Sequence, residues 1–419
     1  MTNPPLVICP HCARLHERTP IAPGAIASCV QCGYELYRHS RVSLEGWLAL
    51  CWTSLFVFMV ANLFPVAHIA LSGKTVDASF PHALYLTWLS GDYVVALMAG
   101  LFVFAFPLGQ ILFLMWAIQA VRKRRLPWDF RFGLRMLEVL SHWSMIPVLF
   151  LGMLVSMVKM ADLAKLTPAT GLWAFGILAF MLTGLSRVSA HRLWHEAEDD
   201  GLVARSGSTL TTDHIAACSA CGYVQDMPRD KTGKTCDRCS AYFHLRKPKS
   251  NSRAWAFLAA AAMLYFPANF YPVMTMRLPT GVESHTILGG VVELWQLGSW
   301  DLALIVFIAS IIVPLTKILV LTALMSARHW RGPLLQRQRT RLYEMVELVG
   351  QWSMLDVFVV IFLSSMADFP GLVQIIPGLG AASFGLVVIL TMFAAMSYDP
   401  RLGWDQGKMQ LEKSTQHGG

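Results

Sequence analysis

The sequence contains the same unit twice, and each copy begins with two C-x2-C pairs and continues as a series of long apolar segments. Residues 61–66 (Ala-Asn-Leu-Phe-Pro-Val) recur as 268–273 (Ala-Asn-Phe-Tyr-Pro-Val), and 143–145 (Trp-Ser-Met) recur as 352–354. Equivalent positions are 207 to 209 residues apart, a spacing far too consistent for chance. The sequence therefore predicts two related modules in tandem.

The apolar segments indicate a membrane protein. Hydrophobic residues make up 55% of the chain and charged residues 14%, whereas about a quarter of the residues in soluble domains are charged. We therefore predict an all-α polytopic membrane protein with two tandem four-helix transmembrane modules, each preceded by a small, β-rich cytoplasmic zinc ribbon. Eight segments are long and apolar enough to cross a bilayer core about 30 Å thick. They are 47–71, 93–121, 137–159, 170–190, 254–277, 302–326, 343–367 and 378–397.

These segments divide the chain into five predicted parts. Ribbon 1 occupies residues 1–42 and is followed by the first module, residues 43–195. A linker and ribbon 2 fill residues 196–250, before the second module at 251–405 and a polar tail at 406–419. The N-terminal part is polar and cysteine-rich, so no cleavable signal peptide is predicted.

Basic residues gather on the loops of one side of the membrane. Because cytoplasmic loops carry an excess of Lys and Arg, this bias places the basic loops in the cytoplasm. Four spans per module then put both cysteine clusters and both termini there. A net charge of +8 could indicate a nucleic-acid partner, but the distribution of the basic residues matters more than their total. Their grouping on one side of the membrane argues against such a partner. The basic loops hold Arg122, Lys123, Arg124, Arg125, Arg131 and Arg135, and Arg328, Arg331, Arg337, Arg339 and Arg341. The loops on the opposite side of the membrane hold only Lys74, Lys165 and Arg277.

Eight of the nine cysteines form two four-cysteine clusters. The C-x2-C pairs are separated by 16 residues in the first cluster and by 14 in the second. This spacing is typical of a structural Zn²⁺ held by four thiolates in a tetrahedron, with each C-x2-C turn supplying two sulfurs. The predicted metal ligands are Cys9, Cys12, Cys29, Cys32, Cys218, Cys221, Cys236 and Cys239.

Disulfides and iron are the alternatives to zinc in these clusters. A cytoplasmic location disfavours disulfides, and iron is the lesser alternative. Because cysteine fills all four ligand positions, none is left for a catalytic water, and both sites are predicted to be structural. His11 lies inside a C-x2-C turn, where it would be a fifth ligand, so we expect it on the surface. Gly33 and Gly222 follow two of the turns, where a residue with positive φ is useful.

Ionisable residues inside a membrane span indicate function, because burying charge in a bilayer is costly. Lys317 is the clearest case. At a rise of 1.5 Å per residue it lies about 16 Å from Arg328, too deep in its span to reach the cytoplasmic interface comfortably. Pro314, three residues earlier, removes a backbone donor and is predicted to kink this helix. The carbonyl freed near Ser310 is a candidate partner for the lysine or for water.

Asp356 and Thr391 lie at a depth similar to that of Lys317, so the three side chains are candidates for one polar cluster. A Lys–Asp pair would lower the cost of burying both charges. Alternatively, the threonine hydroxyl bonds a carbonyl of its own helix. In the alignment of the repeats, Lys317 corresponds to Gln110 and Asp356 to Pro147. The charges are therefore peculiar to the second module, which places the predicted active site there or between the modules.

Several polar and aromatic residues are expected near the outer surface of the membrane. Lys159 and Asp162 lie near the outer end of the third span, where they either belong to a functional site or anchor the span at the interface. The aromatic-rich segments 82–88 and 291–295 are candidates for helices lying in the outer interface. They are also typical of an aromatic belt.

The complete pattern resembles the paraquat-inducible protein A family. Two four-cysteine ribbons, each followed by four spans, match its organisation over nearly the whole chain. The most specific stretches are 267–272 (Pro-Ala-Asn-Phe-Tyr-Pro), 313–317 (Val-Pro-Leu-Thr-Lys), 351–358 (Gln-Trp-Ser-Met-Leu-Asp-Val-Phe) and 399–405 (Asp-Pro-Arg-Leu-Gly-Trp-Asp). C-x2-C pairs alone are not specific for this family.

The resemblance implies an inner-membrane subunit of Gram-negative bacteria that works with an MCE-domain protein. The stacked rings of such a partner form a hydrophobic tunnel across the periplasm. The family member is expected to pass phospholipids between the inner membrane and that tunnel, which supports the outer-membrane barrier. In one branch of the family, an intramembrane polar network includes an aspartate, a lysine and a threonine. The matching positions here are Asp162, Lys317 and Thr391.

A lipid-handling transporter subunit is thus the leading functional hypothesis. No nucleotide-binding motif is present, so the driving force must come from a partner, an ion gradient or the lipid gradient itself. The charges at Lys317, Asp356 and Asp162 make proton coupling physically reasonable. The alternatives are a passive scaffold that anchors and gates the tunnel, and a redox sensor built on the zinc thiolates. An enzyme is not expected, because no catalytic constellation stands out.

Overall fold

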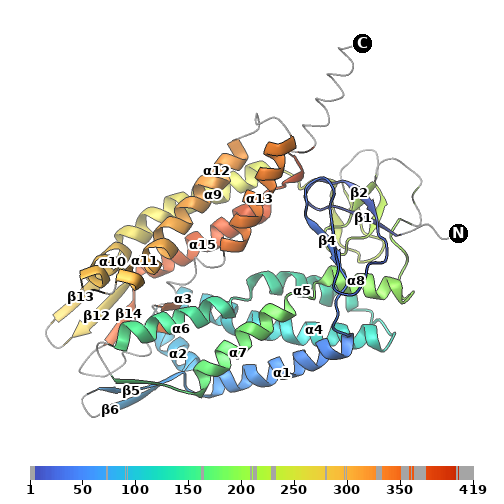
Figure 1. Cartoon of the computed structure of the whole chain (residues 1–419). Helices are drawn as coiled ribbons and strands as arrows, with labels where there is room; N and C mark the ends of the chain where they lie inside the picture. Colours follow the sequence, from blue (N-terminus) through green and yellow to red (C-terminus); the bar gives the residue numbers. More distant parts are fainter. Residues whose placement is uncertain are drawn as a thin grey trace.

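The computed structural model describes residues 5–71, 74–89, 91, 93–161, 165–207, 210, 215–227, 233–278, 281–296, 298, 300–326, 333–350, 358–359, 361–362, 374–402 and 404. The chain is mostly helical. In Figure 1 the helices of both halves run between small β-sheets at one end and the cysteine ribbons at the other. The first half is coloured blue to green, and the second yellow to red.

Within the described residues, the two halves begin with the same order of elements, which supports the repeat seen in the sequence. Each begins with a long helix and a β-hairpin, and continues with a short helix and a long helix containing a π-helical segment. In the first half these helices are α1 (Leu44–Leu63), α2 (Phe80–Leu89), α3 (Tyr93–Ala99), η1 (Gly100–Ala105), α4 (Phe106–Arg122), α5 (Phe130–Trp143), α6 (Ile146–Ala161), α7 (Thr170–Leu185) and α8 (Ala190–Asp199). In the second they are α9 (Ser250–Phe270), α10 (Ile287–Gln296), α11 (Trp300–Phe307), η2 (Ile308–Ile312), α12 (Val313–Ser326), α13 (Pro333–Gly350) and α15 (Leu379–Ser397).

Several of these helices can cross a membrane. Within the described residues, five stretches are long and apolar enough: Leu44–Leu63, Tyr93–Arg122, Phe130–Val158, Ala303–Ser326 and Leu379–Ser397. The pair α7 and α8, bent by 48°, would make a sixth. The chain is therefore a multi-pass membrane protein.

The remaining predicted spans coincide with helices that do not satisfy the same requirements. Helix α9 is 21 residues long but has polar residues near both ends, Arg253 and Asn269. Most of the predicted span at 343–367 lies outside the described residues, beyond the end of α13. The prediction of eight spans therefore remains a prediction.

The outer ends of two predicted spans are wrong, because the chain there forms strands. The segments 47–71 and 254–277 leave the helix at Leu63 and Phe270 and turn through Pro-Val into β5 and β12. Each strand is the centre of a three-stranded antiparallel sheet. The strands are β5 (Ala67–Leu71), β6 (Lys74–Ala78) and β7 (Lys165–Pro168), and β12 (Met274–Leu278), β13 (Gly281–His285) and β14 (Gln374–Pro377). Hydropathy cannot separate a short apolar strand from the end of an apolar helix.

The proline of each repeated Asn-x-x-Pro stretch links the sheet to a later helix, α7 in the first half and α15 in the second. The backbone N–H of Gly171 donates to the carbonyl of Pro65 at 2.9 Å, and that of Gly380 donates to the carbonyl of Pro272 at 3.0 Å. A Cβ atom on either glycine would lie 2.6 Å from a backbone carbonyl oxygen of this turn. The repeat thus preserves a close helix–turn contact that only glycine permits at both places.

The two halves pack against each other within one hydrophobic core. Phe384 and Val388 of α15 belong to the same buried cluster as Phe102 and Met145 of the first half. Between the halves, the hydroxyl of Ser156 in α6 also donates to a backbone carbonyl of the second half at 3.2 Å. The halves therefore form one packed unit.

Candidate functional site: two four-cysteine centres and a buried lysine

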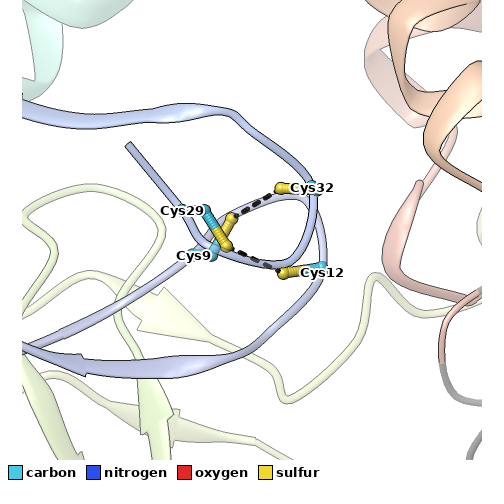
Figure 2. A group of neighbouring side chains, drawn as sticks. All are labelled: Cys9, Cys12, Cys29 and Cys32. Carbon is cyan, nitrogen blue, oxygen red and sulfur yellow. Dashed lines mark hydrogen bonds between the residues drawn. The ribbon is translucent and has the colours of Figure 1, made fainter. Parts of the chain in front are cut away.

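Each cysteine cluster is built from the turns of two β-hairpins, so the prediction of β-rich ribbons is confirmed. In ribbon 1 the turn between the first two strands carries Cys9 and Cys12, and the turn between the next two carries Cys29 and Cys32. The Sγ atoms lie 3.5 Å apart in the pairs Cys9–Cys32 and Cys12–Cys29, as Figure 2 shows. The strands are β1 (Leu6–Ile8), β2 (Leu15–Glu17), β3 (Ile26–Ser28) and β4 (Glu35–Arg38).

Ribbon 2 repeats this geometry. The Sγ atoms of Cys218 and Cys239, and those of Cys221 and Cys236, lie 3.6 Å apart. Its strands are β8 (Ile215–Ala217), β9 (Val224–Asp226), β10 (Lys234–Thr235) and β11 (Tyr242–Phe243).

Every C-x2-C turn contains a residue with positive φ just after its second cysteine. Gly33 and Gly222 have φ values of 84° and 71°, as the sequence led us to expect. Ala13 and Ser240 take the same conformation in the other two turns, with φ values of 58° and 56°. All four turns thus have the same backbone shape, with or without glycine.

Both clusters fit a tetrahedral metal ion. Four thiolates bound at about 2.3 Å to Zn²⁺ are separated by about 3.8 Å, and within each cluster all four sulfurs lie within 4.8 Å of one another. All eight cysteines are buried and free, and their sulfurs are much farther apart than the roughly 2.05 Å of a disulfide bond. The thiols of each cluster hydrogen-bond one another, which lowers the pKa of Cys32 and Cys236 and raises the pKa of Cys9 and Cys221.

Two histidines accompany the cysteines of ribbon 1. The prediction that His11 lies on the surface is wrong, because only 8% of the residue is exposed. Its ring stacks on Tyr34, with the centroids 4.0 Å apart, and its Nδ1 lies 3.5 Å from a carboxylate oxygen of Glu344 in α13. His16, which the sequence analysis did not single out, places Nε2 3.3 Å from the Sγ of Cys29.

The second candidate site surrounds Lys317 in α12. This residue is 4% exposed, and within the described part of the chain its Nζ has no hydrogen-bond partner. Immediately before α12 lies the π-helical segment η2, in which Val313 donates its N–H to the carbonyl of Ile308. Ser310 is fully buried, and its hydroxyl donates to the carbonyl of Val306 at 2.6 Å.

The first half has a matching arrangement around Gln110. The π-helical segment η1 precedes α4, and Pro107 and Gln110 occupy the positions that Pro314 and Lys317 occupy in the second half. Gln110 is 3% exposed, and its Oε1 has no hydrogen-bond partner among the described residues. Single π-helical turns inside longer helices occur frequently at functional sites. The sequence repeat identified the two polar positions but not the π-helical segments.

The other predicted members of the polar network are only partly covered by the described residues. Thr391 is 1% exposed, and its hydroxyl donates to the carbonyl of Val388 in its own helix at 2.8 Å. This hydrogen bond agrees with the alternative interpretation of Thr391, in which its hydroxyl bonds a carbonyl of its own helix. Asp162 and Asp356 lie outside the described residues, and of Lys159 only the backbone, near the end of α6, is described. The proposed network around Lys317 therefore stays a prediction.

Comparisons with known proteins settle the family. The sequence matches the paraquat-inducible protein A family over residues 44–198 and 252–408. This chain belongs to that family. It is 31% identical over 408 residues to the intermembrane transport protein PqiA of Escherichia coli K12, covering 96% of this chain and 95% of the relative. It is also 31% identical over 399 residues to the lipophilic envelope-spanning tunnel protein A of the same strain, covering 95% and 90%.

A probable intermembrane transport protein of Haemophilus influenzae is 26% identical over 414 residues, covering 96% of this chain and 97% of the relative. No solved structure matches the chain. These relatives are named as intermembrane transport proteins or as an envelope-spanning tunnel protein, and they are matched over nearly their whole length.

Proposed function

We propose that this chain is the inner-membrane subunit of a system that transports phospholipid between the bacterial inner and outer membranes. It passes lipid to or from a tunnel that an MCE-domain protein forms across the periplasm, and it thereby supports outer-membrane integrity. The names of the relatives support this proposal, because they describe transport between membranes and an envelope-spanning lipophilic tunnel. We assign it no enzymatic activity.

In this proposal both termini and both ribbons lie in the cytoplasm, and each ribbon holds one structural Zn²⁺ on its four thiolates. The three-stranded sheets then lie on the periplasmic side, where the partner is. The position of the basic residues supports this orientation, because Arg122, Arg124 and Arg131 lie at the ribbon end of the helices. Arg131 donates to Ser240 of ribbon 2 at 2.9 Å.

The buried Lys317 is the observation that carries the proposal. Its ammonium group lies in a membrane-crossing helix, next to a π-helical segment, with no hydrogen-bond partner among the described residues. Burying such a group is costly, so a passive scaffold would have no reason to keep it. We propose that Lys317, Asp356 and Asp162 carry the proton movements that drive lipid transfer. Ser310, Thr391 and Lys159 complete the proposed network.

Two measurements test this function. The tagged protein, extracted gently from its native membrane, should carry an MCE-domain protein and phospholipid, both identified by mass spectrometry. Recovery of the protein alone and poor in lipid would contradict the proposal. The wild-type complex should also move fluorescent phospholipid between proteoliposomes and acceptor vesicles.

The Lys317→Met variant should lose this lipid transfer while still capturing the partner, and Lys317→Arg should lose it too, because a guanidinium group does not release its proton. Gln110→Met, at the equivalent position of the first half, is the matched control and should transfer lipid normally. Full transfer by Lys317→Met would instead support the passive scaffold.

A further inference from the structure

The two ribbons dock on opposite halves of the molecule. Ribbon 1 precedes the first half in the sequence, yet its cysteine turns contact the second half. The guanidinium of Arg337 in α13 donates to the carbonyl of Gln31, inside the second turn, at 2.9 Å. His11, inside the first turn, approaches Glu344 of the same helix. Trp404, which follows the last span, is buried in one cluster with the four cysteines.

Ribbon 2 docks in the equivalent way on the first half. Arg131 in α5 donates to Ser240, next to Cys239, at 2.9 Å. Arg238, inside the same turn, forms an ion pair with Glu198 of α8 at 2.8 Å, and the two side chains are only 3% and 1% exposed. A Cβ atom on Gly222 would lie 3.1 Å from the ring of His191, so α8 also closely approaches the other turn.

Ribbon 1 also reaches back to the first half, so it bridges both. Arg18, which follows β2, forms an ion pair with Asp199 and a hydrogen bond with His195, both in α8. The N–H of Leu6 donates to the carbonyl of Ser206 in the linker before ribbon 2, at 3.1 Å. Figure 1 shows ribbon 1 between α13 on one side and α8 on the other. Ribbon 1 thus connects the first half to the second half at the cytoplasmic end of the protein.

The contacts with α13 come from residues that the metal site shapes. Gln31 and His11 lie between two metal ligands of a C-x2-C turn, so their positions follow from the fold of the cluster. Small four-cysteine units depend on the metal for their folding energy. By contrast, Arg18 contacts α8 from outside the turns. Loss of metal from ribbon 1 should therefore break its contacts with α13 before its contacts with α8.

From these contacts we infer that ribbon 1 is a metal-dependent clamp that fixes the cytoplasmic end of the second half to the first half. Ribbon 2 has the equivalent role for α5 and α8. The inference concerns the coupling of the halves and does not depend on what the protein transports.

Hydrogen exchange of the full-length protein in lipid nanodiscs tests the clamp. The double variant Cys12→Ser/Cys29→Ser removes metal from ribbon 1 and should lower the zinc content from two ions per chain to one. Amide exchange should then rise by about tenfold or more in residues 333–346 and 398–402, and α5 should keep its wild-type exchange. The variant Cys221→Ser/Cys236→Ser is the matched control and should deprotect α5 while leaving 333–346 protected.

Two further measurements test the inference independently of whether the cysteine variants fold. Chelator titration of the wild-type protein should deprotect 333–346 in step with loss of zinc. The contact variant Arg337→Ala should deprotect the start of α13 while the protein still holds two zinc ions. Unchanged exchange of 333–346 after zinc loss from ribbon 1, or equal deprotection of α5 and α13 by both cysteine variants, would overturn the inference.

Discussion

The two halves of this protein share a backbone but differ in what they bury. Both have a three-stranded sheet, a glycine packed on the Pro-Val turn, and a π-helical segment before a proline. At the same position after that proline, the first half buries Gln110 and the second buries Lys317. The shared features are those required by the fold, and the difference is the basis of our proposal that Lys317 has a function that the fold does not need.

Ribbon 2 provides the prediction with the largest effect on stability. Arg238 and Gln31 are equivalent residues of the two ribbons, but only Arg238 has a buried partner, Glu198. Arg238→Ala should destabilise the ribbon by about 3–5 kcal/mol, because it leaves a buried carboxylate unpaired. Gln31→Ala should have little effect, since its contact with α13 uses the backbone carbonyl. Chelator resistance of each zinc measures both effects, and equal resistance in the two variants would contradict the assignment.

The turn glycines test whether the halves are built alike. Gly171→Ala and Gly380→Ala should each lower the free energy of unfolding by about 1–3 kcal/mol, because the new methyl group meets a backbone carbonyl that cannot move aside. Thermal unfolding in nanodiscs would compare the two variants, with Gly290→Ala as the control, because a Cβ atom at that position would meet nothing within 4 Å. A clear difference between Gly171→Ala and Gly380→Ala would break the structural equivalence of the halves.

Asp399 provides a smaller, pH-dependent effect in the second half. Burial raises the pKa of this carboxyl, but hydrogen bonds from Arg401 and from the Lys247 N–H lower the pKa by a larger amount. The pKa therefore lies below its usual range. A carboxylate with a depressed pKa stabilises the fold above the unfolded value of about 3.9, and this contribution is lost as the pH falls through the folded pKa. Exchange of residues 398–402 should therefore rise below about pH 4.

In the Asp399→Asn variant this acid-dependent step should disappear. The equivalent position in the first half is Ala190, which has no ionisable group. An acid step that persists in the variant would mean that another group causes it.

The smallest effect is expected at an exposed ion pair of the first half. Arg124 and Asp200 lie 3.2 Å apart, with side chains 71% and 36% exposed. Arg124→Ala should change the melting temperature only marginally, because water and salt screen such pairs. A large loss of stability would show that the loop after α4 holds α8 in place, and the comparison with the buried Arg238–Glu198 pair would need revision.

Local sequence patterns predicted local structure well. The cysteine spacing indicated the ribbons because each C-x2-C turn is encoded by adjacent residues. Features that depend on distant contacts were missed. The sequence predicts apolar strand β5 as the end of a span. It also predicts His11 on the surface, because nothing near His11 in the sequence reveals its partner Glu344, more than 300 residues away. No local pattern reveals that Gln31 contacts Arg337, or that the π-helical segments precede Pro107 and Pro314.

The variant Lys317→Gln tests the central claim most directly, because it gives the second half the side chain that the first half already accommodates. Lipid transfer and thermal unfolding are measured on the same nanodisc preparation, with Gln110→Leu as the control for altered packing. We predict that Lys317→Gln loses lipid transfer while its melting temperature stays equal to or above that of the wild type. Normal transfer by Lys317→Gln, or loss of transfer only together with loss of the fold, would contradict the claim that this lysine is kept for function.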